Sequence, residues 1–135
     1  MYNLFISHSW AYSYHYDNLI NLLNSRPYFN YKNYSVPKED PIHNAPTVGE
    51  LRLAIQKQMS YSSVIIILAG VYATRSKWIN IEIDLARHGF LRQKPIIAIK
   101  PRENTLVSSV VREAATELIN WNTESIISAI RRNAI

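Results

Sequence analysis

Three short apolar runs constrain the fold of this chain more than any other feature. They cover residues 2–6, 63–68 and 95–100, and a weaker run covers residues 31–36. A strand with one face in water alternates apolar and polar residues, whereas Ile, Val, Leu, Phe and Ala make up most of these runs. Such runs are typical of strands buried on both faces, as in a parallel sheet that helices cover on each side.

Helical patterns separate these runs. Apolar residues recur at helical spacing in residues 17–24, 47–60 and 76–91, and again in residues 123–132, where Asn122 or Thr123 is the expected N-cap. The alternation of strand and helix predicts parallel strands joined by right-handed crossovers. We therefore expect an α/β fold: a flavodoxin-like, doubly wound parallel sheet of five strands in the order 2-1-3-4-5, flanked by helices.

Length and composition limit the possible functions. The 135 residues suit a single domain spanning residues 1–135. The absence of cysteine removes disulfides and thiolate chemistry and favours a cytoplasmic protein. No signal-peptide core and no apolar run close to the ~20 residues that span a bilayer is present, so we expect no membrane association. The net charge of +5 favours a polyanion such as a dinucleotide or a phosphorylated metabolite, but the basic residues are scattered and predict no nucleic-acid site.

The segment Ser76–Glu82 contains the best candidate for a functional residue. Trp78 and Glu82 are four residues apart and would lie one turn apart on the same face of a helix. The flanking isoleucines leave few polar surroundings, so Glu82 is expected either to point into a cleft or to have a partner. The alternative is a surface carboxylate that the helix dipole favours near a helix start. Trp78 is expected mainly to pack and so to support Glu82.

Polar residues follow the carboxyl ends of the expected strands, where ligands of doubly wound sheets bind. The first strand leads into Ser7, His8, Ser9 and Trp10. The loop of residues 37–46 has three prolines and is long enough to be a binding loop. Trp10 is either an exposed loop residue or a stacking surface.

These segments carry a family resemblance. Residues 2–9, Tyr-Asn-Leu-Phe-Ile-Ser-His-Ser, resemble the first strand of Toll/interleukin-1 receptor (TIR) domains. Ser-Lys-Trp-Ile-Asn-Ile-Glu resembles the tryptophan-to-glutamate motif on the third helix of those domains. Residues 68–78 are similar to the bacterial TIR-like branch that includes the Thoeris anti-phage defence protein ThsB, and the resemblance extends from residue 2 to about residue 132.

The resemblance implies cleavage of the nicotinamide–ribose bond of NAD, which is then a substrate and not a cofactor, with Glu82 as the catalytic carboxylate. It also implies a nucleotide product that a separate effector protein reads, and homo-oligomers on activation. The substrate-binding residues expected on this basis are Ser7, His8, Ser9, Trp10, Asp40, His43 and Trp78.

Other functions are weaker fits to the residues. A phosphate-accepting receiver domain needs acidic residues at its first strand ends to hold a divalent cation, and residues 2–10 contain none. A flavodoxin needs a glycine-rich phosphate loop after its first strand, which is also missing here. The four histidines lack metal-ligand spacing, so we expect no metal site. A non-catalytic TIR-like adaptor that acts by self-association remains open.

Overall fold

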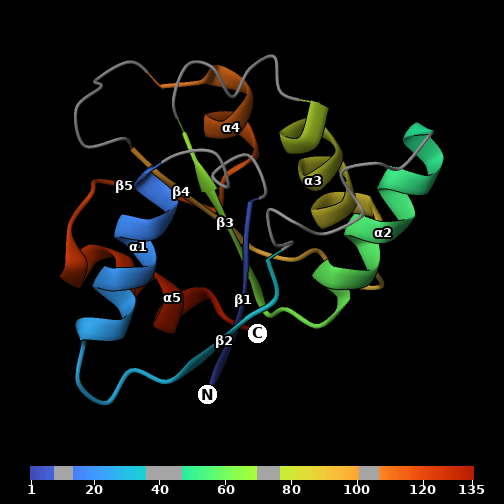
Figure 1. The fold of residues 1–135 in the computed structure, drawn as a ribbon. Coiled ribbons are helices and arrows are strands. Elements are labelled where there is room, and N and C mark those ends of the chain that lie inside the picture. Colours follow the sequence, from blue (N-terminus) through green and yellow to red (C-terminus); the bar gives the residue numbers. More distant parts are fainter. Residues whose placement is uncertain (8–13, 36–46, 70–76, 101–106) are drawn as a thin grey trace.

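The computed structural model describes residues 1–7, 14–35, 47–69, 77–100 and 107–135 (Figure 1). The strands are β1 (Tyr2–Ile6), β2 (Tyr31–Asn33), β3 (Val64–Leu68), β4 (Ile96–Ile99) and β5 (Glu117–Ile119). The helices are α1 (Tyr14–Ser25), α2 (Val48–Ser60), α3 (Lys77–His88), α4 (Ser109–Ala114) and α5 (Thr123–Asn133).

The five strands form one parallel sheet in the order β2-β1-β3-β4-β5. Phe5 pairs with Ile65, and Ile66 pairs with Ile97, so the long apolar runs meet side by side in the middle of the sheet. The short strands β2 and β5 are the edges. The predicted α/β class and strand order are confirmed.

Successive residues of the central strands contribute to two separate cores. On one face Phe5, Ile65 and Ile67 pack with α2, α3 and α4. On the other face Leu4, Ile6 and Ile66 pack with α1 and α5. The period-two alternation of strand side chains therefore explains why these runs are apolar at nearly every position.

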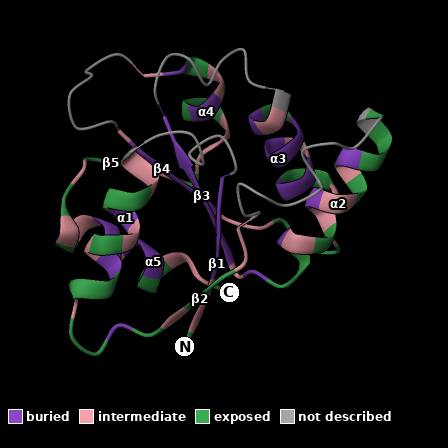
Figure 2. Ribbon diagram, in the orientation of Figure 1, coloured by how far each residue is buried: buried purple, intermediate pink, exposed green. Residues whose placement is uncertain are grey.

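The helices cover the sheet as right-handed crossovers require. Figure 1 views the sheet nearly edge-on, with α1 and α5 on its left and α2 and α3 on its right. Figure 2 shows that the middle strands are buried along their length, while each flanking helix turns exposed residues outward. The described parts of the chain contain no helix that is long and apolar enough to cross a membrane.

Side-chain caps fix where several helices begin. The Thr47 hydroxyl accepts a bond from the Glu50 amide (3.1 Å), and the Asn122 amide oxygen accepts one from the Ser125 amide (3.1 Å). Asn122 is thus the cap of the last helix, one of the two residues that the sequence suggested. The third helix ends at His88, shorter than the predicted segment, because Gly89 follows it directly.

Candidate functional site

Glu82 lies at the centre of the buried face of α3. Successive residues of an α-helix are about 100° apart, so the buried residues of α3 span an arc of about 200°. Glu82 is near the middle of that arc and is 0% exposed. The other buried residues of the arc are Ile79, Ile81, Ile83, Leu85 and Ala86, all part of one apolar core.

A carboxylate at such a position is chemically unusual. Burying an ionised carboxylate costs several kcal/mol, and an apolar residue of similar volume is often at least as stable. The core would therefore accept a leucine or isoleucine here on packing grounds alone. The acid at this position therefore indicates a role that packing does not explain.

Helix α2 holds α3 in place at two points. Arg52 forms an ion pair with Asp84 across the two helices (2.5 Å). Further along, the Gln56 side-chain amide donates to the Gly89 carbonyl (2.9 Å), just past the end of α3. These contacts, with the apolar packing between the two helices, fix the rotation of α3 and so the direction in which Glu82 points.

The sheet has its topological switch point between β1 and β3. The chain leaves β1 for α1 on one face and leaves β3 for α3 on the other face. In doubly wound folds ligands bind at the carboxyl ends of the two strands that flank this point. Ser7 directly follows β1, and its amide continues the ladder by donating to the Ile66 carbonyl (2.8 Å).

Ser7 and Glu82 belong to the same side of the sheet. Strand alternation assigns Ser7 to the face of Phe5, which is the face that α3 covers. Ser7 is also 0% exposed. Helix α3 follows β3 along the chain, and Glu82 lies about one and a half turns from the start of this helix. A hydroxyl and a carboxylate therefore occupy one side of the switch point.

Trp78 lies one turn before Glu82 and is half-buried. Its side chain packs against the apolar core of α2 and α3. Its support of Glu82 stays a prediction. The remaining predicted site residues lie outside the described residues: His8, Ser9, Trp10, Asp40 and His43.

Ser108 was not predicted as part of this edge. It is buried, its amide donates to the carbonyl of Ala69 at the end of β3 (3.0 Å), and its hydroxyl caps α4. The serine pair that precedes Val110 and Val111 is the capping signal that could have located it.

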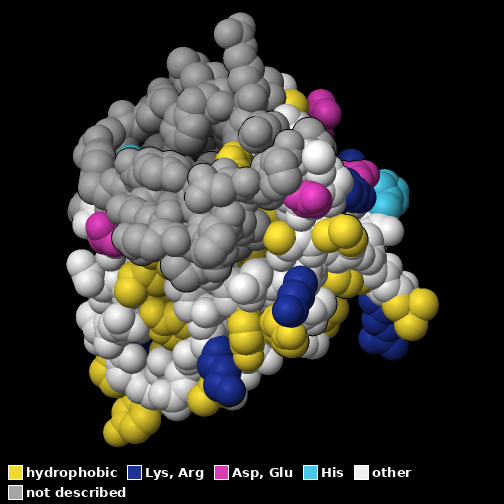
Figure 3. All heavy atoms as spheres, turned by 45° about the vertical axis from the view of Figure 1, so that its right-hand side comes forward, with side chains coloured by type: hydrophobic (Ala, Val, Ile, Leu, Met, Phe, Trp, Pro, Cys, Tyr) yellow, Lys and Arg dark blue, Asp and Glu magenta, His cyan; other side chains and the backbone are white. Residues whose placement is uncertain are grey.

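The described residues contain no group of three or more His, Asp or Glu placed to hold a metal ion. On the face in Figure 3, some Lys and Arg side chains lie apart from one another and others lie beside acidic side chains. The surface described there gives no continuous basic patch.

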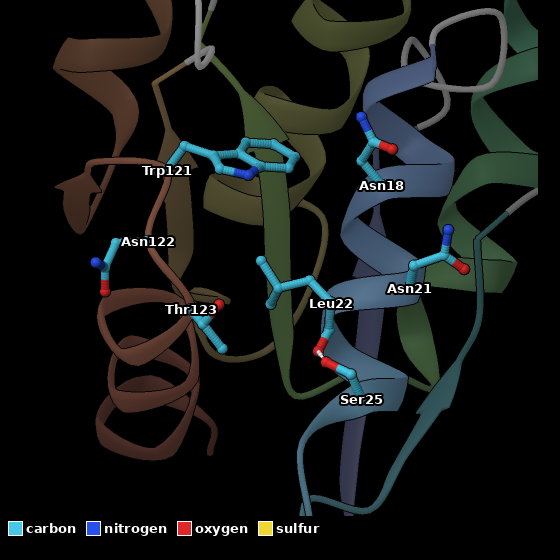
Figure 4. A pocket seen from close by; sticks show the side chains of 7 residues that line it. All are labelled: Asn18, Asn21, Leu22, Ser25, Trp121, Asn122 and Thr123. Atoms are coloured by element: carbon cyan, nitrogen blue, oxygen red, sulfur yellow. Dashed lines mark hydrogen bonds between the residues drawn. The ribbon is translucent and has the colours of Figure 1, made fainter.

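A groove of about 550 Å³ lies on the opposite face of the sheet from Glu82 (Figure 4). It runs between α1 and the start of α5. Its described lining residues are Asn18, Asn21, Leu22, Ser25, Trp121, Asn122 and Thr123.

A comparison with known families identifies the chain. The model of the TIR-like domain of the Thoeris protein ThsB matches residues 5–106. The chain belongs to this family. The match runs from the end of β1 through β4 and includes Ser7, Trp78 and Glu82 of this TIR-like domain. A search of curated proteins gives no match to the chain.

Proposed function

We propose that this TIR-like domain is an enzyme of anti-phage defence that cleaves NAD, with Glu82 as the catalytic carboxylate. The observation that carries the proposal is the full burial of Glu82 in the middle of the α3 core face, beside the switch point of the sheet. Membership of the Thoeris ThsB family supports the defence role.

The chemistry needs a single well-placed carboxylate. Cleavage breaks the bond between ribose C1′ and the nicotinamide nitrogen, and both electrons go to that nitrogen, so nicotinamide leaves as a neutral molecule. The ribose becomes oxocarbenium-like, and a carboxylate beside it stabilises the positive charge and binds the ribose hydroxyls. A water oxygen then bonds to C1′ and loses a proton, or an adenine nitrogen closes a ring.

The burial of Glu82 sets a condition on this activity. A group that is 0% exposed reaches a substrate only after the groups that cover it move. We therefore propose that phage infection causes the protein to self-assemble, and that self-assembly opens the site and activates the enzyme. A separate effector protein would read the ADP-ribose-derived product.

Nicotinamide release from NAD tests the role of Glu82. We expect Glu82→Gln to lower the rate at least about 100-fold, the loss typical of removing one group that stabilises transition-state charge. Glu113→Gln is the matched control, because Glu113 is an exposed carboxylate on α4 that has no part in the proposed site. Circular dichroism would check that both variants fold.

Two outcomes would contradict the proposal. Equal turnover by wild type and Glu82→Gln would remove Glu82 from the mechanism. Absence of turnover by the wild type, even at concentrations where it self-associates, would favour the adaptor. This second candidate is a non-catalytic TIR-like adaptor that acts by self-association, and it requires no contact between the buried Glu82 and a substrate.

A further inference from the structure

The groove between α1 and α5 has the features of a ligand site separate from Glu82. Its volume of about 550 Å³ is in the range of small-molecule sites, which is roughly 300–1,000 Å³. Glu82 belongs to the core of the other sheet face. A ligand in the groove would therefore not contact the proposed catalytic carboxylate.

Helix α1 forms one wall of the groove. Asn18, Leu22 and Ser25 are spaced so that they share one face of the helix, with Asn21 beside them. Asn18 and Asn21 are exposed. The Ser25 hydroxyl donates to the Leu22 carbonyl (2.8 Å), so its oxygen can still accept from a ligand.

The opposite wall is the segment that enters α5. Trp121 is half-buried, packs against the core between α1 and α5, and has its ring centroid 5.8 Å from that of His15. In Figure 4 the side chains of Leu22 and Thr123 turn into the space between the helices, with the Trp121 indole at one end. Asn122 caps α5 with its amide oxygen, and that cap does not use its amide N–H groups.

The lining contains amides, hydroxyls, an indole and a leucine, but no charged side chain among the described residues. The next residues along the chain, Arg26 and Glu124, form an ion pair with each other. The described part of the lining therefore offers no cation to neutralise a phosphorylated ligand. The groove instead suits a neutral ligand that has both apolar faces and many hydroxyls.

We propose that this groove binds a neutral saccharide. The C–H face of a sugar ring is apolar and fits against Trp121 and Leu22. Sugar hydroxyls both donate and accept hydrogen bonds, as do the side chains of Asn18, Asn21 and Thr123. Because the groove has two walls but is open to solvent, we expect weak binding, with specificity from the amides.

The test is a titration monitored by the indole N–H signals of the ¹⁵N-labelled protein, with the Trp121 signal assigned from Trp121→Phe. The probes are N,N′-diacetylchitobiose and maltose, and adenosine represents a neutral nucleoside. We expect at least one saccharide to shift the Trp121 signal. The double variant N18A/N21A should bind about tenfold more weakly, since it loses two hydrogen-bonding amides.

The variants are chosen so that folding does not obscure the result. Asn18 and Asn21 are exposed on a helix, where alanine is favourable. Asn30→Ala removes an exposed amide outside the groove and should bind like the wild type. No shift with either saccharide, a shift with adenosine alone, or equal saccharide affinity in N18A/N21A would each overturn the proposal.

Discussion

Two neighbouring isoleucines of β3 give a sharp test of the two-core architecture. Ile66 packs into the core with α1 and α5, and Ile67 packs into the core with α2, α3 and α4. Both are 0% exposed. In a sheet with one face in water, shortening one of these side chains would have little effect. Here we expect Ile66→Val and Ile67→Val both to destabilise the protein.

The expected loss of stability in each valine variant follows from the burial of the side chain that is shortened. Each substitution removes one fully buried methylene, which loses about 0.8 kcal/mol of transfer free energy. Any cavity that remains raises the cost toward about 1.5 kcal/mol. Because the two side chains belong to different cores, the double variant should lose roughly the sum, about 2–3 kcal/mol.

Urea denaturation at neutral pH measures these losses. For a denaturant slope of about 2 kcal/mol per molar, each single variant should lower the midpoint by roughly 0.5 M. Leu53→Ala is the control, because Leu53 is 67% exposed and its loss should change stability by no more than about 0.5 kcal/mol. If either valine variant matched the wild type, β3 would not be buried on both faces as described.

Three further perturbations test local contacts. A hydrogen bond from Arg132, and then one from Asn133, hold the pKa of the Glu117 carboxyl below its usual range. The ionised carboxylate therefore stabilises the folded protein above the unfolded-state pKa of Glu117. This stabilisation is lost as the pH falls through the folded-state pKa. The stability difference between wild type and Glu117→Gln should be about 0.5 kcal/mol at pH 7 and vanish in acid, and a difference that grows in acid would contradict this. Gly89→Ala should lower the melting temperature, since an added Cβ would lie 2.8 Å from the Leu85 carbonyl oxygen; a higher melting temperature would refute the contact. Asn122→Ala should cost about 1 kcal/mol by removing the α5 cap, as chemical denaturation would show; an unchanged midpoint would contradict that role.

The central part of the fold could be predicted from the sequence because strong burial leaves a strong pattern. β1, β3 and β4 lie within the predicted runs, and α2 and α5 match their predicted segments to within a residue. β2 is shorter than the run of residues 31–36 because only three residues pair with β1.

The last part of the sheet could not be located in the same way. β5 has three half-buried residues, Glu117, Leu118 and Ile119, at an edge where only one neighbour pairs with them. α4 spans six residues, too few for a helical period to be visible. In both cases the rest of the fold determines the structure, and the local pattern does not.

The candidate site, too, could be predicted from the sequence only in part. The sequence indicated Glu82 because an acid among isoleucines is conspicuous, and the structure places it in the interior. Ser108 was missed because a serine before a short helix reads as an ordinary cap. The groove beside Trp121 depends on α1 and α5 lying next to each other, which spacing along the chain does not reveal.

Helix α5 lies outside the residues that the family match covers, yet it is part of the second core. The matched region is therefore smaller than the region that folds as one domain. The family match ends at residue 106, yet Ile126, Ile127 and Ile130 share a core with the strand residues Ile6 and Ile66, which lie inside the match. A fragment ending at residue 106 would retain Glu82 and α1 but expose the part of the second core that α5 covers. Domain grafts and truncations of this protein should therefore be cut after α5.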